Sequence, residues 1–186
     1  LSPRWGVLML EVKDWKLSTL GRATRDAVEL RTPRGQSTVA HPLRQARDCA
    51  MEMVGHMQQD AALCHDAGPF RGKLLFPYGW GVVMSGLLSS DVAGGDFGTL
   101  FPPARTLLRD DLAELVPAGA FQQRLWGMFT VHYPITLSLP QRDRIRWHLF
   151  PEVRLQQQAA LAFEPEARPS LPDLMPQGQC AVTLDP

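Results

Sequence analysis

The chain has 186 residues, of which 45% are hydrophobic and 20% are charged. These values are typical of one folded globular domain and exclude a disordered or fibrous class. Lysine plus arginine balance aspartate plus glutamate at 19 each, so we expect no molecule-wide attraction to nucleic acid or to an anionic membrane, and any polyanion site must be a local patch.

Membrane-spanning segments, secretory signals and cysteines indicate the cellular compartment of a protein. No apolar run approaches the roughly 20 residues that a membrane-spanning helix needs, and the N-terminus shows no basic segment followed by an apolar one, as a secretory signal would. The three cysteines, Cys49, Cys64 and Cys180, are far apart and lack metal-ligand spacing. An odd number of widely spaced cysteines favours a reducing compartment, in which they stay as free thiols. We therefore expect a cytoplasmic protein with no membrane partner.

The first third of the chain predicts strands followed by a long helix. Strands are expected over residues 6–14, 17–24, 28–31 and 36–40, with a turn at Thr32-Pro33-Arg34-Gly35. Pro42 suits the first turn of a helix, after which apolar residues recur at intervals of three and four. They are Leu43, Ala46, Ala50, Met53, Met57 and Ala61. This spacing predicts a helix over residues 41–64 with one buried stripe.

The rest of the chain predicts two more strands, at residues 73–76 and 80–85, and then a Gly-rich segment at 93–98. That segment lacks the Gly-Lys-Ser/Thr ending of a P-loop, so we interpret it as a turn. Helices are expected at residues 119–132, and at 139–149 with Ser138 as the cap. The inward residues of the first are Phe121, Leu125, Met128 and Phe129. Repeated prolines after residue 164 indicate a linker or tail.

Glu11 and Lys13 stand two residues apart at the end of the first strand and so project from one face. The carboxylate can bind a hard divalent cation, with the Val12 carbonyl as a second oxygen ligand, while the amine orients or helps deprotonate an attacking water. This pattern suits hydrolysis of a phosphodiester. An ion pair at a sheet edge, contributing on the order of 0 to 1 kcal/mol, explains the same spacing. The spacing alone leaves both interpretations open.

Two segments resemble the NERD (nuclease-related) domain, a branch of the PD-(D/E)XK nuclease-like superfamily. The family pattern is a hydrophobic strand ending in Glu-X-Lys-Asx-Trp and, later, Asn-Pro-Leu-X-Gln at the start of a helix. The matching segments are Gly6-Val7-Leu8-Met9-Leu10-Glu11-Val12-Lys13-Asp14-Trp15 and His41-Pro42-Leu43-Arg44-Gln45-Ala46, where His41 replaces the family's Asn. The likeness continues through residues 72–74, 77–83, 109–112 and 145–152. Nearly the whole chain resembles the long form found in front of UvrD-like superfamily-one DNA helicases.

The resemblance implies roles for individual residues. Glu11 and the Val12 carbonyl become ligands of Mg²⁺ or Mn²⁺, both of which accept oxygen. Lys13 becomes the catalytic lysine. Gln45 becomes the helix residue that faces the active site, near backbone amides that favour a phosphate; without the family, Gln45 is equally well a surface glutamine. The implied substrate is DNA, and the implied partner is a helicase motor domain in the parent chain.

The implied fold is α/β, with a mixed central sheet flanked by helices. We expect a restriction-endonuclease-like core over residues 1–116, a helical extension of the same domain over 117–163, and a Pro-rich linker or tail over 164–186. The superfamily also uses an acidic residue on the strand before Glu-X-Lys, and the resemblance places that strand upstream of Leu1. A metal-dependent nuclease and a catalytically inactive DNA-binding or helicase-regulatory module therefore both remain open.

Three further groups have two interpretations each. Asp110 and Asp111 are either a substitute metal ligand or, as N-cap preferences favour, a cap. A basic group at residues 142–154 either contacts a phosphate backbone or forms surface ion pairs; its members are Arg142, Arg144, Arg146 and Arg154. Trp147 and His148 either stack on a base or pack in the core. The five histidines lack zinc-site spacing.

Overall fold

A parallel sheet lies at the centre of the fold. In the computed structural model, which describes residues 1–93 and 95–150, the strands pair in the order β1 (Val7–Lys13), β5 (Tyr78–Met84) and β6 (Thr106–Leu108). β1 and β5 run parallel, from Val7 opposite Tyr78 to Lys13 opposite Met84. β5 is largely buried on both faces, as the middle strand of a parallel sheet must be.

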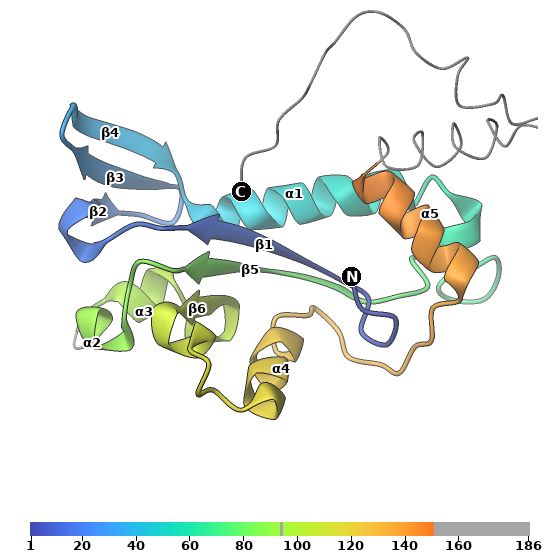
Figure 1. The fold of residues 1–186 in the computed structure, drawn as a ribbon. Coiled ribbons are helices and arrows are strands. Elements are labelled where there is room, and N and C mark those ends of the chain that lie inside the picture. The colour runs from blue at the N-terminus through green and yellow to red at the C-terminus, as the bar shows by residue number, and fades with distance from the viewer. Residues whose placement is uncertain (94, 151–186) are drawn as a thin grey trace, which may run out of the picture. The chain divides into compact units, whose positions relative to one another are not determined.

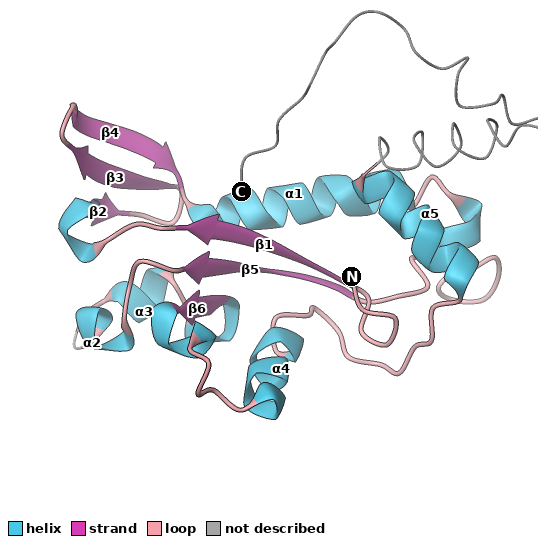
Figure 2. Cartoon of the chain, in the orientation of Figure 1, coloured by secondary structure: helices cyan, strands magenta, loops and turns pink. Residues whose placement is uncertain are grey.

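A second sheet is antiparallel and contains β2 (Leu20–Ala23), β3 (Ala27–Thr32) and β4 (Gly35–Ala40). The predicted turn is present as a hairpin between β3 and β4, and Gly35 has a φ of 117°, which glycine adopts without strain. The α/β class with flanking helices is therefore confirmed, with the strands divided between a parallel and an antiparallel sheet (Figure 2).

The strand predicted over residues 17–24 is too long. Leu17–Thr19 form a 3-10 turn instead, and β2 begins only at Leu20. The Thr19 hydroxyl donates to the Lys16 carbonyl at 2.7 Å and accepts from the Lys16 N–H at 3.2 Å. These local side-chain hydrogen bonds satisfy backbone groups that a strand would have needed to pair.

The long helix α1 (Pro42–Met57) covers one face of β1 and β5 (Figure 1). His41 caps it, because its Nδ1 accepts a hydrogen bond from the Leu43 N–H at 3.2 Å. One stripe is buried: Pro42, Ala46, Ala50, Val54 and Met57. The helix ends at Met57, not at the predicted residue 64. Asp60 accepts from the Ala62 N–H and starts a separate 3-10 turn, Ala61–Leu63.

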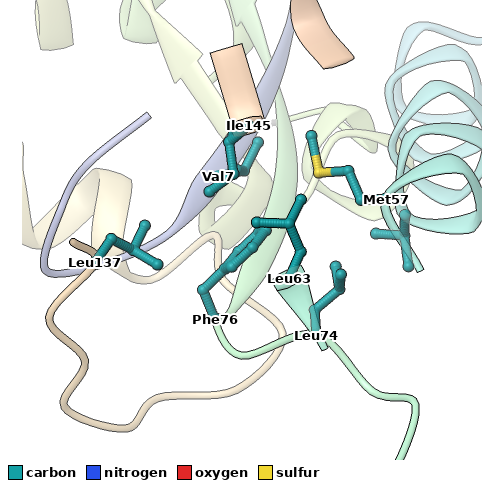
Figure 3. Packing of buried hydrophobic residues seen from close by; sticks show 8 residues of the cluster. Val7, Met57, Leu63, Leu74, Phe76, Leu137 and Ile145 are labelled. Carbon is teal, nitrogen blue, oxygen red and sulfur yellow. The ribbon is translucent and has the colours of Figure 1, made fainter. Parts of the chain in front are cut away.

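One hydrophobic cluster joins β1, α1, the segment after α1 and helix α5 (Leu139–Leu149). Figure 3 shows its side chains converging: Val7, Met57, Leu63, Leu74, Phe76, Leu137 and Ile145. The strand predicted at residues 73–76 is absent. Leu74 makes only an isolated bridge to Cys64, and residues 74 and 76 place their side chains in this cluster. Burial of apolar side chains holds this segment, together with backbone hydrogen bonds from the His65 N–H to the Lys73 carbonyl and from the Leu75 N–H to the Leu63 carbonyl, both at 2.9 Å.

The helix predicted over residues 119–132 is shorter than expected. α4 spans Ala118–Trp126, and Gly127 follows it as the C-cap. Met128 and Phe129 are nevertheless buried. They follow α4 in a turn where the Met128 N–H donates to the Leu125 carbonyl at 3.1 Å, and beyond it the Thr130 N–H donates to the Tyr78 carbonyl at 3.0 Å. This contact ties the segment to the start of β5.

α5 has the predicted bounds. Ser138 and Gln141 form a capping box at its start: the Ser138 N–H donates to the Gln141 Oε1 at 2.9 Å, and the Gln141 N–H donates to the Ser138 Oγ at 3.4 Å. The helical extension expected over residues 117–163 is described only as far as residue 150, where it comprises α4 and α5. The tail expected at 164–186 and Arg154 lie outside the described residues.

Short elements fill the connection between β5 and α4. They are α2 (Ser89–Val92), α3 (Phe97–Leu100) and two 3-10 turns, Pro103–Arg105 and Arg109–Leu112. The Gly-rich segment interpreted as a turn therefore runs into α3 at Phe97. Among the described residues, every helix is too short or too polar to cross a bilayer.

Candidate functional site

Glu11 and Lys13 form an ion pair near the C-terminal end of β1. The Lys13 Nζ lies 2.6 Å from the Glu11 Oε1, and the two side chains are 22% and 32% exposed, respectively. The alternation of side chains along a strand places both on one face, as predicted. The Lys13 Nζ also lies 5.6 Å from the centroid of the Trp15 ring. The pair is half-buried and remains open to solvent on one side.

The register shows which face of the sheet carries this pair. Val7, on the same face of β1, packs in a cluster with Met57 from the last turn of α1. α1 runs in the opposite direction to β1 (Figure 1), so the C-terminal end of β1 lies toward the N-terminal half of α1. Glu11 and Lys13 thus occupy the sheet face that α1 covers.

Gln45 lies in the first turn of α1, where its N–H donates to the His41 carbonyl at 3.0 Å. Its side chain is half-buried, and the Oε1 atom is buried without a hydrogen-bond partner. Gln45 is therefore neither fully buried nor fully exposed. Among the described residues, no hydrogen bond joins Gln45 to Glu11 or Lys13.

The backbone of Val12 faces away from β5. The Lys13 carbonyl accepts from the Ser85 N–H at 2.9 Å, so the backbone groups of Lys13 point toward β5. Backbone groups alternate in direction along a strand, which directs the Val12 carbonyl to the other edge of β1. Within the described part of the chain, that edge pairs with no strand. The carbonyl oxygen is therefore available as a ligand.

The metal expected from the resemblance requires oxygen ligands. Glu11 supplies a carboxylate and Val12 a carbonyl, which is the chemistry that Mg²⁺ and Mn²⁺ select. Within residues 1–93 and 95–150, no group of three His, Cys, Asp or Glu side chains is placed to hold a metal ion. The donor types match this metal chemistry, and the Glu11 Oε1 atom is paired with Lys13.

Asp110 and Asp111 bind backbone amides, which supports their interpretation as caps. Asp110 accepts from the Ser89 N–H at 3.0 and 3.2 Å, and Asp111 accepts from the Leu108 N–H at 2.8 Å. The hydrogen bonds from Ser89 lower the pKa of Asp110. Asp111 also pairs with Arg124 at 2.9 Å. Both carboxylates are thus engaged in holding the turns around β6.

Two of the three described arginines of the basic group on α5 form ion pairs. Arg144 binds Asp60 at 2.7 Å, and Arg146 lies 3.5 Å from Asp143. The His148 ring also contacts Asp60, at 3.2 Å. Trp147 is 41% exposed and packs edge-on against the His148 ring, so it is not a core residue. Ion pairing thus accounts for Arg144 and Arg146, whereas the buried Nε of Arg142 has no hydrogen-bond partner.

A cleft with a volume of about 530 Å³ lies beside the first turn of α1, and the sequence interpretation missed it. It brings together Arg25, His41, Arg47 and Arg105 from separate parts of the chain. No local motif connects these positions. The one local signal is His41, a residue with a polar ring directly before Pro42 at the start of a helix.

Comparison with known proteins identifies no relative: no family model, no curated protein and no solved structure matches this chain.

Proposed function

We propose that the chain is a metal-dependent, nuclease-like domain that hydrolyses phosphodiester bonds in DNA, as a module of a cytoplasmic DNA helicase involved in DNA processing or repair. The observation that carries this proposal is the pairing of Glu11 and Lys13 at 2.6 Å on the sheet face beneath α1. The resemblance to the NERD domain supports the same assignment. The carboxylate is of the type that binds a hard divalent cation, and the amine beside it can orient an attacking water.

Each residue has a defined part in the proposed reaction. Glu11 and the Val12 carbonyl would hold Mg²⁺ or Mn²⁺, which when bound lowers the pKa of a water and neutralises charge on the phosphate. Lys13 orients the attacking water and stabilises its negative charge. The water oxygen gives up a proton to solvent and forms a bond to phosphorus, the bond from phosphorus to the leaving strand oxygen breaks, and that oxygen takes up a proton from solvent. Gln45 presents a buried amide from the first turn of α1.

A second candidate is a catalytically inactive module that binds DNA or regulates a helicase motor. Two observations favour it: the described residues contain no three-residue metal-ligand group, and Lys13 neutralises the Glu11 carboxylate. In this case the ion pair has a structural role, with the small contribution typical of partly exposed pairs.

A plasmid-nicking assay separates the two candidates. It is run on the chain as printed and on the full-length product of its gene, with Mg²⁺, with Mn²⁺ and with EDTA. Lys13→Ala and Glu11→Gln test the site, and Lys73→Ala, at an exposed lysine in the segment before β5, is the matched control. We expect metal-dependent nicking that both site variants lose, by about 100-fold or more if Lys13 acts as an acid–base group.

Thermal unfolding of each variant checks that the fold is retained. Full nicking activity in Lys13→Ala would remove this lysine from the mechanism. Nicking that EDTA leaves unchanged would contradict the metal requirement. Absence of nicking by the full-length protein with either metal, together with retained DNA binding, would favour the inactive module.

A further inference from the structure

The cleft beside the first turn of α1 is rich in arginine. Arg25 enters it from the connection between β2 and β3, Arg47 from α1, and Arg105 from the turn before β6. Its volume of about 530 Å³ falls within the range of roughly 300–1,000 Å³ that small-ligand sites occupy. The cleft lies outside the Glu11–Lys13 pair, and neither of these residues lines it.

The cleft has fewer acidic residues than arginines. Asp26 and Asp48 both line it, and both pair with Arg44, at 3.0 and 3.6 Å. By contrast, no carboxylate among the described residues lies within ion-pair distance of Arg25, Arg47 or Arg105. With Arg44 included, four arginines and two aspartates line the cleft, an excess of two positive charges.

Arg105 lines the cleft, and three contacts hold its guanidinium. Its guanidinium stacks on Trp80, 4.3 Å from the ring centroid. It also donates hydrogen bonds to the Trp80 carbonyl at 3.0 Å and to the Met128 carbonyl. Burial lowers the pKa of Arg105, which reflects a charge taken partly out of water. Burying a cation without an acidic partner costs free energy, and an anionic ligand bound beside it would offset that cost.

His41 adds an unpaired donor at the wall of the cleft. The residue is only 2% exposed, its ring stacks on Phe101 at 4.4 Å, and its Nδ1 accepts from the Leu43 N–H. Because Nδ1 is the acceptor, Nε2 carries the proton of the neutral ring. Nε2 is buried and has no hydrogen-bond partner. The start of α1 at this point adds the partial positive charge of a helix N-terminus.

We propose that this cleft binds a phosphate group, carried by a nucleic-acid strand or by a nucleotide. Arginine forks match the geometry of phosphate oxygens, and several can bind one phosphate together. The helix N-terminus and the His41 ring favour the same negative, oxygen-rich ligand. This inference goes beyond the proposed hydrolysis and holds whether or not Glu11 and Lys13 cleave DNA.

Fluorescence anisotropy with a labelled single-stranded oligonucleotide tests the proposal. The buffer contains EDTA, so that binding is measured without hydrolysis and independently of the nuclease proposal. Arg25→Gln and Arg47→Gln each remove one unpaired charge. Arg34→Gln, in the exposed β3–β4 turn and outside the cleft, removes the same charge as a matched control. We expect each cleft variant to weaken binding about tenfold or more, the effect of one charge-assisted hydrogen bond, and the control to bind like the unchanged protein.

Three probes identify the source of the phosphate. Tighter binding of a 5′-phosphorylated oligonucleotide than of its 5′-hydroxyl form supports a terminal phosphate. Equal binding of both, weakened in Arg47→Gln, supports internal phosphates of the strand. Displacement of the oligonucleotide by adenosine monophosphate, but not by inorganic phosphate, supports a nucleotide. The proposal is overturned if Arg34→Gln weakens oligonucleotide binding as much as the two cleft variants do. It is also overturned if the cleft variants bind the oligonucleotide normally while thermal unfolding shows that they are folded.

Discussion

Asp60 joins α5 to the turn that follows α1, and its charge makes a measurable contribution to stability. The carboxylate accepts hydrogen bonds from the Arg144 Nε at 2.7 Å, the Arg144 Nη2 at 2.8 Å and the Ala62 N–H at 3.1 Å. It also lies 3.2 Å from the His148 Nε2. Its side chain is only 10% exposed. We predict that Asp60→Asn, which keeps the shape and a cap for Ala62, destabilises the fold.

The magnitude follows from the pKa of this group. Hydrogen bonding to Arg144, reinforced by His148 and Ala62, lowers the pKa of Asp60 from 3.8 to about 2. That difference corresponds to about 2.4 kcal/mol of folding free energy. Because Arg144 is 47% exposed, solvent screening reduces the expected contribution to about 1–2 kcal/mol.

The lowered pKa of Asp60 determines how stability changes with pH. A lowered pKa in the folded state means that the unfolded chain binds the proton more readily. The stabilisation is therefore complete above pH 3.8 and disappears as the pH falls toward 2. The destabilisation caused by Asp60→Asn should accordingly shrink over the same interval.

Urea unfolding, followed by circular dichroism at a series of pH values from 7 to 2, measures this effect. Asp66→Asn is the matched control, since Asp66 is exposed and forms no ion pair among the described residues. We expect Asp60→Asn to lose about 1–2 kcal/mol at pH 7 and the control to lose almost nothing. A loss of equal size at pH 7 and pH 2, or no loss at pH 7, would refute the assigned role of the Asp60 charge.

Two further predictions concern packing, and thermal unfolding checks both. Gly79→Ala should destabilise the fold by about 1–3 kcal/mol, because an added Cβ would lie 2.3 Å from the Met128 carbonyl oxygen. Gly55→Ala in α1 meets no atom within 4 Å and should stabilise by up to about 1 kcal/mol; equal effects at the two glycines would disprove the close contact. Ile145→Ala should cost about 2–5 kcal/mol, since this α5 residue is fully buried, whereas Leu139→Ala, on the same helix and 63% exposed, should be nearly neutral. Similar losses in both α5 variants would show that the helix does not pack as described.

Local periodicity was enough to find several elements. Alternation along the first strand placed Glu11 and Lys13 on one face, and the structure pairs them at 2.6 Å. The spacing after Ser138 gave α5 its correct bounds, since the capping box with Gln141 uses only neighbouring residues. These features depend on contacts within a few positions of the chain, which sequence patterns report directly.

Contacts between residues far apart in the sequence decided the features that local patterns predicted wrongly. α1 stops at Met57 because Asp60 caps a new turn, and Asp60 is held by Arg144 from far along the chain. The segment at residues 73–76 is apolar enough for a strand, yet it fills the cluster between α1 and α5 instead.

What the sequence by itself determined is the α/β class and the acid–amine pair at the end of β1. Only the tertiary structure decided that this pair lies beneath α1 and that Arg25, Arg47 and Arg105 meet in one cleft. The physical reason is that strand and helix periodicity is a property of adjacent residues. The compensation of buried charge, by contrast, depends on which side chains the packed elements bring within a few ångströms.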